Sequence, residues 1–311
     1  MSSSPSLPKV GSHLVLSLPA PHVFQMTLNR PQQLNAMTDE LEVDIRRSFD
    51  FFEHEPSLWI MVLTGNGRAF CAGQDLKNWL DKNRGKVETV LHPSGQPMQA
   101  ESEYSKSLQR LHQGGFGALS TRRSTKPIIA AVDGICMGGG AETLVNCDIV
   151  VASQRSVFAF PEVKRGVVAA MGGIPRLSQL CGHQRASELL LLGHTITAQE
   201  AHDRYNMINR LVPVEKSAPI DEGQKAVEAV ALDLARQMTE NSPDSLFATK
   251  EALVLARDAA GDDIDASARA GVQGERSRLL NVGQNIAEGL EAFKNKRAPR
   301  WFNPAKAQAK L

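Results

Sequence analysis

Two uninterrupted apolar runs, each leading into a glycine, constrain the fold of this 311-residue chain more than any other feature. Residues 59–63 precede Gly65, and residues 128–132 precede Gly134. A run of that length without a polar position is typical of a strand buried on both faces, as in the parallel sheets of α/β proteins. A helical segment at 141–146 follows the second run. The repeated order of strand, glycine-containing turn and helix therefore predicts an α/β fold.

The chain before the first run begins with two alternating apolar stretches, 14–18 and 23–28, which we expect to form strands. Thr38 then has the side chain of a helix N-cap, followed by acidic residues in the first turn. The apolar side chains of this expected helix recur on one face: Leu41, Ile45, Phe49 and Phe52.

The rest of the pattern predicts three parts. Residues 1–10 are rich in Ser and Pro and lack the features of a secretory or mitochondrial signal, so we expect a disordered leader. Residues 11–225 form the predicted core, in which the polar stretch 81–125 is expected to be a variable loop or lid. Residues 226–311 form a predicted helical region with a basic tail. Helical periodicity marks three of its segments: 226–239, 243–259 and 264–279.

Composition excludes several classes of partner. The formal net charge is +1, which gives no electrostatic footprint for nucleic acid or for acidic membranes. No apolar run approaches the length of a transmembrane helix. The four cysteines form no C-x-x-C pair and have no histidine at metal-ligand spacing, so we predict free thiols, a reducing compartment and no metal site.

Four segments carry residues suited to chemistry: Phe70–Lys77, Gly138–Glu142, Phe160–Glu162 and Glu288–Trp301. Three consecutive glycines before a helix expose backbone N–H groups that suit an anion. No Lys follows them as in a phosphate loop, which disfavours a nucleotide site. Pro161 leads us to expect extended backbone at Glu162. Each segment alone also fits an ordinary turn, a solvated acid or a solvated tail.

In this order, the four segments resemble the crotonase superfamily, the enoyl-CoA hydratase/isomerase family. The resemblance also takes in 28–31, 35–37, 63–65, 126–152 and 160–177. It implies a spiral of β-β-α turns, with C-terminal helices that mediate trimerisation into a homotrimer or homohexamer. It also implies an acyl-CoA thioester substrate and no further cofactor, because coenzyme A is part of the substrate.

The resemblance assigns the catalytic roles to four residues. The backbone N–H groups of Gln74 and Gly139 would stabilise an enolate-like oxyanion on the thioester carbonyl. Glu142 would orient and deprotonate water for addition at C3, and Glu162 would protonate C2. Paired carboxylates in a desolvated pocket repel each other, so we expect one pKa to rise. The implied activity is that of a 2-enoyl-CoA hydratase, a lyase of the kind used in fatty acid metabolism.

The resemblance also implies binding residues. Those for coenzyme A would be Arg30, Gln32, Gln33, Leu34, Ala72, Leu76, Lys77, Phe293 and Lys296, the last two often serving a neighbouring subunit. A backbone N–H near Ala170 would help to hold the water. Trp79, Phe116 and Met171 are candidates for the acyl pocket, although core packing would equally explain each. Ala169 stands where the family commonly has Pro, which we expect to change the shape of the pocket.

Three alternative functions fit the sequence less well. A Δ3,Δ2-enoyl-CoA isomerase needs only one carboxylate, whereas both hydratase glutamates are present. A specialised acyl-CoA hydratase or dehydratase is a variant of the leading hypothesis. A non-catalytic scaffold would not need the intact glutamate pair. The terminal Ala309-Lys310-Leu311 resembles a peroxisomal address, so we expect recognition by an import receptor and a peroxisomal location, or otherwise a cytoplasmic one.

Overall fold

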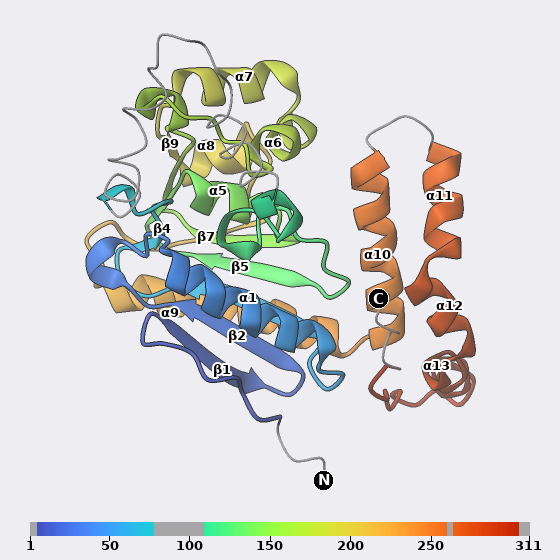
Figure 1. Cartoon of the computed structure of the whole chain (residues 1–311). Helices are drawn as coiled ribbons and strands as arrows, with labels where there is room; N and C mark the ends of the chain where they lie inside the picture. Colours follow the sequence, from blue (N-terminus) through green and yellow to red (C-terminus); the bar gives the residue numbers. More distant parts are fainter. Residues whose placement is uncertain (1–4, 78–108, 260–263, 305–311) are drawn as a thin grey trace.

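Two β-sheets, which the chain visits alternately, form the centre of the protein (Figure 1). The computed structural model describes residues 5–77, 109–259 and 264–304. The larger sheet has the strand order β1 (Leu14–Ala20), β2 (Val23–Leu28), β3 (Ile60–Gly65), β5 (Ile128–Val132), β7 (Ile149–Ser153) and β10 (Arg210–Val212). The smaller sheet has the order β4 (Ala69–Cys71), β6 (Ile135–Met137), β8 (Val157–Ala159) and β9 (Ile196–Thr197).

Successive turns of the chain add one strand to each sheet. The pairs β3–β4, β5–β6 and β7–β8 each place their first strand in the larger sheet and their second in the smaller one. Pairing is parallel from β2 to β10, and also from β4 to β8. Helix α5 (Gly139–Leu144) follows the β5–β6 turn. This arrangement confirms the predicted α/β spiral of β-β-α turns.

Both faces of the larger sheet are covered, which explains its uninterrupted apolar strands. Met61 and Leu63 of β3 pack into the core that includes α1 (Asp39–His54). Ile60 and Val62 point to the opposite face, where they pack with residues of α9 (Ile220–Thr239). A polar side chain at any of these positions would therefore be buried without water.

Helix α1 begins as the sequence predicts. The side-chain oxygen of Thr38 accepts a hydrogen bond from the N–H of Leu41 at 3.3 Å, which satisfies one of the free donors of the first turn. The predicted apolar face is buried at all four of its positions: Leu41, Ile45, Phe49 and Phe52.

The other helices lie around the smaller sheet and in the C-terminal part. Near the smaller sheet are α6 (Gly173–Cys181), α7 (His183–Leu192) and α8 (Ala198–Asp203) (Figure 1). The C-terminal helices are α10 (Pro243–Ala259), α11 (Ile264–Gln273), α12 (Glu275–Val282) and α13 (Gln284–Lys294). Helix α9 starts at Ile220 and packs on the sheet, so the boundary predicted at residue 225 falls inside it.

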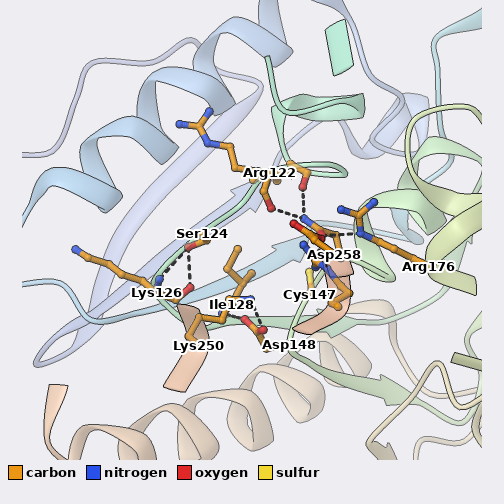
Figure 2. A network of polar contacts seen from close by, with 12 residues as sticks. Arg122, Ser124, Lys126, Ile128, Cys147, Asp148, Arg176, Lys250 and Asp258 are labelled. Atoms are coloured by element: carbon orange, nitrogen blue, oxygen red, sulfur yellow. Dashed lines mark hydrogen bonds and ion pairs between the residues drawn. The ribbon is translucent and has the colours of Figure 1, made fainter. Parts of the chain in front are cut away.

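Polar contacts attach α10 to the beginnings of β5 and β7 in the larger sheet (Figure 2). Lys250 forms an ion pair with Asp148, whose other oxygen accepts the N–H of Ile128 at 2.8 Å. Farther along the helix, the Arg257 guanidinium donates to the side-chain oxygen of Asn146 at 2.9 Å. The C-terminal helices are thus joined to the sheet through α10.

Several predictions fall on residues outside the described ranges. These are Trp79, most of the predicted 81–125 loop, and the terminal Ala309-Lys310-Leu311. Within the described ranges, no helix is long and apolar enough to cross a membrane. The same ranges contain no group of three or more His, Cys, Asp or Glu side chains that could hold a metal ion.

Candidate active site

Glu142 is a buried carboxylate held by two backbone donors. It lies on α5 with 4% of its surface exposed, and its Oε1 accepts the N–H groups of Met171 at 2.8 Å and Gly173 at 3.0 Å. Burial raises the pKa of Glu142 to about 7, the Gly173 N–H opposes this, and the negative charge of Glu162 raises it further. The carboxyl group can therefore gain or lose a proton near neutral pH.

Glu162 is the second carboxyl of the predicted pair. Its Oε2 is buried and has no hydrogen-bond partner among the described residues, and burial raises its pKa. Its Oε1 would lie 3.4 Å from a Cβ added at Gly138, the residue that precedes α5. Glu162 therefore lies beside the start of the helix that carries Glu142, and its charge contributes to the raised pKa of Glu142.

The backbone at Glu162 differs from the expectation. Glu162 begins a short 3₁₀ helix, η3 (Glu162–Arg165), and Pro161 stands immediately before it. The expected extended conformation is wrong, because a proline restricts the residue before it and readily precedes a helical turn.

The two glycine-containing turns lie against each other. Gly73 has a φ of +93°, and a Cβ at that position would lie 3.5 Å from the nitrogen of Gly139. Gly139 is the first residue of α5, where an N–H has no acceptor within its own helix. Among the described residues, the N–H groups of Gln74 and Gly139 donate to no other group. Two free donors are thus present where the sequence predicted an oxyanion site.

Phe116 packs against the second of these turns, at Gly139. It lies in a short 3₁₀ segment, η2 (Phe116–Ala118), and is 4% exposed. A Cβ at Gly139 would lie 2.3 Å from the Phe116 ring, so only glycine leaves room for the ring. Met171, the other described candidate for the acyl pocket, is partly buried against the core, and its carbonyl accepts the hydroxyl of Ser120 at 2.5 Å.

The sequence predicted a water-holding N–H near Ala170, and the N–H of Ala170 itself donates to the Val168 carbonyl at 2.8 Å. Ala169, where the resemblance led us to expect a change in pocket shape, is buried with 4% exposure. The donors that face Glu142 are those of the next residues along the chain, Met171 and Gly173.

The predicted coenzyme A residues of the N-terminal part gather near the first turn. The Ala72 N–H donates to the Leu34 carbonyl at 3.0 Å, which joins the 30–34 segment to the 72–77 segment. The side chains of Leu76 and Lys77 are exposed. Gln32 and Gln33 lie exposed in a 3₁₀ turn, η1 (Pro31–Gln33).

Arg30 is less available to a phosphate than its charge implies. Its Nη2 lies 3.1 Å from Asp75 Oδ2, and its Nη1 donates to the carbonyl of Ala36. Only 10% of its side chain is exposed. Lys77 is therefore the more accessible cation of the two beside this turn.

Phe293 and Lys296 lie apart from the other predicted coenzyme A residues of the same chain. Phe293 is on α13 and Lys296 follows its end, while β4 and the 72–77 segment are on the opposite side of the molecule (Figure 1). The side chain of Phe293 is 86% exposed. Their predicted contact with coenzyme A would therefore require a neighbouring subunit.

Sequence reasoning missed the groups that support the helix of Glu142. Asn146 follows that helix, and its Oδ1 accepts from Arg176 Nε at 2.8 Å and from Arg257 at 2.9 Å. Its Nδ2 donates to the carbonyls of Leu119 and Arg122 at 2.6 and 3.1 Å. Figure 2 labels two of these partners, Arg176 and Arg122. These contacts join residues far apart in the sequence, so no local pattern predicts them.

Comparison with known proteins agrees with this geometry. The sequence profile described as enoyl-CoA hydratase/isomerase matches residues 20–304. Two similar proteins are the mevalonyl-coenzyme A hydratases of Aspergillus fumigatus and Beauveria bassiana. The first is 36% identical over 92% of this chain and 94% of the relative, and the second is 40% identical over 92% and 93%. A crystal structure of an enoyl-CoA hydratase from Mycobacterium tuberculosis has a TM-score of 0.74 at 28% identity, covering 94% of this chain and all of the other.

The family profile spans nearly the whole chain, and the two relatives align with this chain over nearly their whole length. The spiral fold and the two facing glycine turns agree with that match. This chain is therefore an enzyme of the enoyl-CoA hydratase/isomerase family.

Proposed function

We propose that this protein is an acyl-CoA hydratase, which adds water reversibly across the C2=C3 bond of a 2-enoyl-CoA thioester. The observation that carries the proposal is a pair of carboxyl groups with raised pKa, Glu162 beside Gly138 and Glu142 on the helix that follows it, next to two unused backbone N–H groups. Hydration needs this combination, because it requires an oxyanion site, a base for water and an acid for carbon.

The thioester oxygen would accept the N–H groups of Gln74 and Gly139. As water adds at C3, the C2=C3 electrons move to the thioester carbonyl and leave an enolate oxyanion. Donors fixed beforehand stabilise that charge more than they stabilise the ground-state carbonyl, which lowers the barrier. Losing one such donor costs about 3 kcal/mol in comparable sites.

The two glutamates would move the protons. Oε1 of Glu142 is held by two N–H groups, which leaves Oε2 to accept a proton from the attacking water. Glu162 would give its proton to C2 and would take that proton back in the reverse, dehydrating direction. In each turnover the water would supply one proton to Glu142 while Glu162 delivers one to carbon, and a proton would return from Glu142 to Glu162 through solvent before the next turnover. Coenzyme A belongs to the substrate, so the proposal includes no further cofactor.

For the acyl group we propose the mevalonyl type. Two relatives at 36% and 40% identity, each matched over 92% of this chain, carry the name mevalonyl-coenzyme A hydratase. A mevalonyl thioester carries a hydroxyl and a methyl on C3 and a second hydroxyl on C5. Loss of water from C2 and C3 would give a branched 2-enoyl thioester, which is the reverse of the proposed hydration.

The test uses the purified full-length protein with two substrates. With mevalonyl-CoA, dehydration is measured as a gain of enoyl-thioester absorbance. With crotonyl-CoA, hydration is measured as a loss of that absorbance. We expect turnover of mevalonyl-CoA with a higher kcat/KM than for crotonyl-CoA. Glu142→Gln and Glu162→Gln should each lower kcat by about 10²–10⁴-fold, the usual contribution of a general acid or base.

Glu215→Gln is the control, because Glu215 is exposed in a loop. It should leave kcat unchanged. No turnover of any 2-enoyl-CoA, or full activity in both glutamine variants, would refute the hydratase proposal. Turnover of a 3-enoyl-CoA that persists in Glu142→Ala would identify an isomerase instead. Faster turnover of crotonyl-CoA than of mevalonyl-CoA would refute only the acyl assignment.

A further inference from the structure

The side chain of Gln74 is fixed at both ends of its carboxamide. Its Nε2 donates to the Met37 carbonyl at 3.1 Å, and its Oε1 accepts from Arg110 Nη2 at 3.1 Å. The backbone on either side is also bonded to Met37, through the Gly73 carbonyl at 2.8 Å and the Asp75 N–H at 3.0 Å. The peptide that presents the Gln74 N–H is thus anchored by its main chain and by its side chain.

Arg110 is itself anchored by a buried acid. The same Nη2 that reaches Gln74 lies 2.7 Å from Oε2 of Glu42, a residue of α1 with 8% exposure. The Arg110 guanidinium also lies 5.5 Å from the centre of the Phe116 ring, which covers Gly139. Arg110 therefore contacts Gln74, one proposed oxyanion donor, and the ring packed on Gly139, the other.

An oxyanion site works only if its donors point to the place where charge develops. A displacement of about 1 Å can cost on the order of 10²-fold in rate. Gly73 leaves the turn without a side chain of its own to restrict it, so a restraint must come from elsewhere. The Glu42–Arg110–Gln74 contacts supply such a restraint from α1 and from the segment after residue 108.

We propose that Arg110 is a positioning residue, which orients the backbone N–H of Gln74 toward the thioester oxygen by holding the Gln74 carboxamide. This inference rests on the proposed hydratase function. Glu42 fixes the guanidinium in turn. The role is distinct from that of Glu142 and Glu162, since Arg110 acts through another residue and exchanges no proton.

Arg46 offers a matched control, because it contacts the same carboxylate, Glu42, as Arg110 does. Its Nη2 lies 3.5 Å from Oε1 of Glu42, the other carboxylate oxygen, and its Nη1 donates to Gln113 at 2.8 Å. Its side chain is 31% exposed, nearly the same as the 32% of Arg110. Arg46 differs from Arg110 in that it has no hydrogen bond to Gln74.

The experiment is a double-mutant cycle on the full-length protein with the best 2-enoyl-CoA substrate. The variants are Arg110→Met, Gln74→Ala and the two combined, with Arg46→Met as the control. Gln74→Ala removes the carboxamide but keeps the backbone N–H. For each variant, kcat, KM and the thermal unfolding midpoint are measured.

We expect Arg110→Met and Gln74→Ala each to lower kcat by about tenfold or more, with KM changed by less than about twofold, because a misaligned donor weakens the transition state more than binding. The double variant should match Gln74→Ala within about twofold, since both changes remove one contact. Arg46→Met should keep the wild-type kcat.

Two results would overturn the inference while leaving the hydratase function intact. The first is wild-type kcat in Arg110→Met. The second is a multiplicative loss in the double variant, which would mean that Arg110 acts independently of Gln74, for example on the acyl chain. If Arg110→Met does not fold, Glu42→Gln replaces it in the same cycle with the same expected and contrary results. An inactive wild-type protein would instead count against the proposed function.

Discussion

The N–H of Gly173 lies 3.0 Å from Oε1 of Glu142, and this close approach depends on the absence of a side chain at residue 173. A Cβ there would lie 2.8 Å from Cγ of Glu142 and 3.1 Å from Oε1. Gly173 starts α6 in a conformation open to any residue, so backbone strain does not explain the glycine. The glycine is explained by the lack of space for a side chain beside the Glu142 carboxylate.

Gly173→Ala should therefore displace the Glu142 carboxylate while leaving the fold intact. We expect kcat to fall by at least about tenfold, because a displaced general base loses its alignment with water. Ser178→Ala, on the same helix, is the control. The Ser178 hydroxyl donates to the Ile174 carbonyl one helical turn earlier, in an exposed hydrogen bond. Steady-state kinetics with both variants at matched thermal stability checks this. Equal kcat in Gly173→Ala and wild type would contradict it.

A second prediction concerns stability and pH. The pKa of Glu142 is raised from 4.5 to about 7 in the folded protein, chiefly by burial. Between these two values the folded state binds more protons than the unfolded state, so this group makes stability fall as pH rises toward 7. Above pH 7, the buried charge costs on the order of 3 kcal/mol, and below about pH 4.5 that cost is absent.

Glu142→Gln removes the charge but keeps an oxygen for the N–H groups of Met171 and Gly173. The variant should therefore be more stable than wild type at pH 8 and about equally stable at pH 4, as measured by urea unfolding at both values. Glu215→Gln, at an exposed site, should show no such pH-dependent difference. A Glu142→Gln protein that is less stable than wild type at pH 8 would show that the carboxylate is not under strain from burial.

The sequence predicts those strands and helices whose own residues form an apolar run or a helical period several residues long. The runs at 59–63 and 128–132 correspond to β3 and β5, and the Thr38 cap and apolar face of α1 are confirmed. The smaller sheet was not predicted, because β4, β6 and β8 have only three residues each and form through pairing between distant segments. The single helix expected at 264–279 is divided at Gly274, which precedes α12.

The same distinction applies to the site. Glu142, Glu162, Gln74 and Gly139 could be named from short motifs that also set the local backbone. The Arg110 contacts join residues 42, 74 and 110, and the support of Asn146 joins residues 146, 176 and 257. Side-chain contacts across such separations depend on how the spiral stacks its turns. No window of the sequence contains both partners.

A third prediction concerns oligomerisation, which we propose to occur through the C-terminal helices. Ile286, Leu290 and Phe293 recur at the spacing of one face of α13, with 40%, 69% and 86% of their surfaces exposed. An exposed apolar stripe of this kind is typical of a contact with another protein surface. Trp301 packs against Gly289, which borders this stripe on the same helix.

Leu290→Glu combined with Phe293→Glu should convert a trimer or hexamer into monomers, as measured by light scattering after size-exclusion chromatography. Val43→Glu, at a 52% exposed apolar position on α1, should leave the assembly unchanged. A wild-type protein that is monomeric at micromolar concentration would contradict this proposal, as would an assembly that survives both substitutions on α13.

The last prediction concerns Lys126, whose ammonium group is buried where α1 ends. Its Nζ donates to the carbonyls of Phe52, Glu55 and Leu58 at 2.6, 2.7 and 2.7 Å, while only 1% of the residue is exposed. Lys126→Met would remove this donor from all three carbonyls, although that of Glu55 would keep the Leu58 N–H at 3.1 Å, so we expect a loss of at least about 3 kcal/mol of stability in urea unfolding. Lys225→Met should leave the unfolding midpoint unchanged, because both side chains of its ion pair with Asp221 are exposed. Since Lys126 lies outside the active site, kcat at low temperature should match wild type. A midpoint as high as that of wild type would mean that water or a shift of α1 satisfies the three carbonyls.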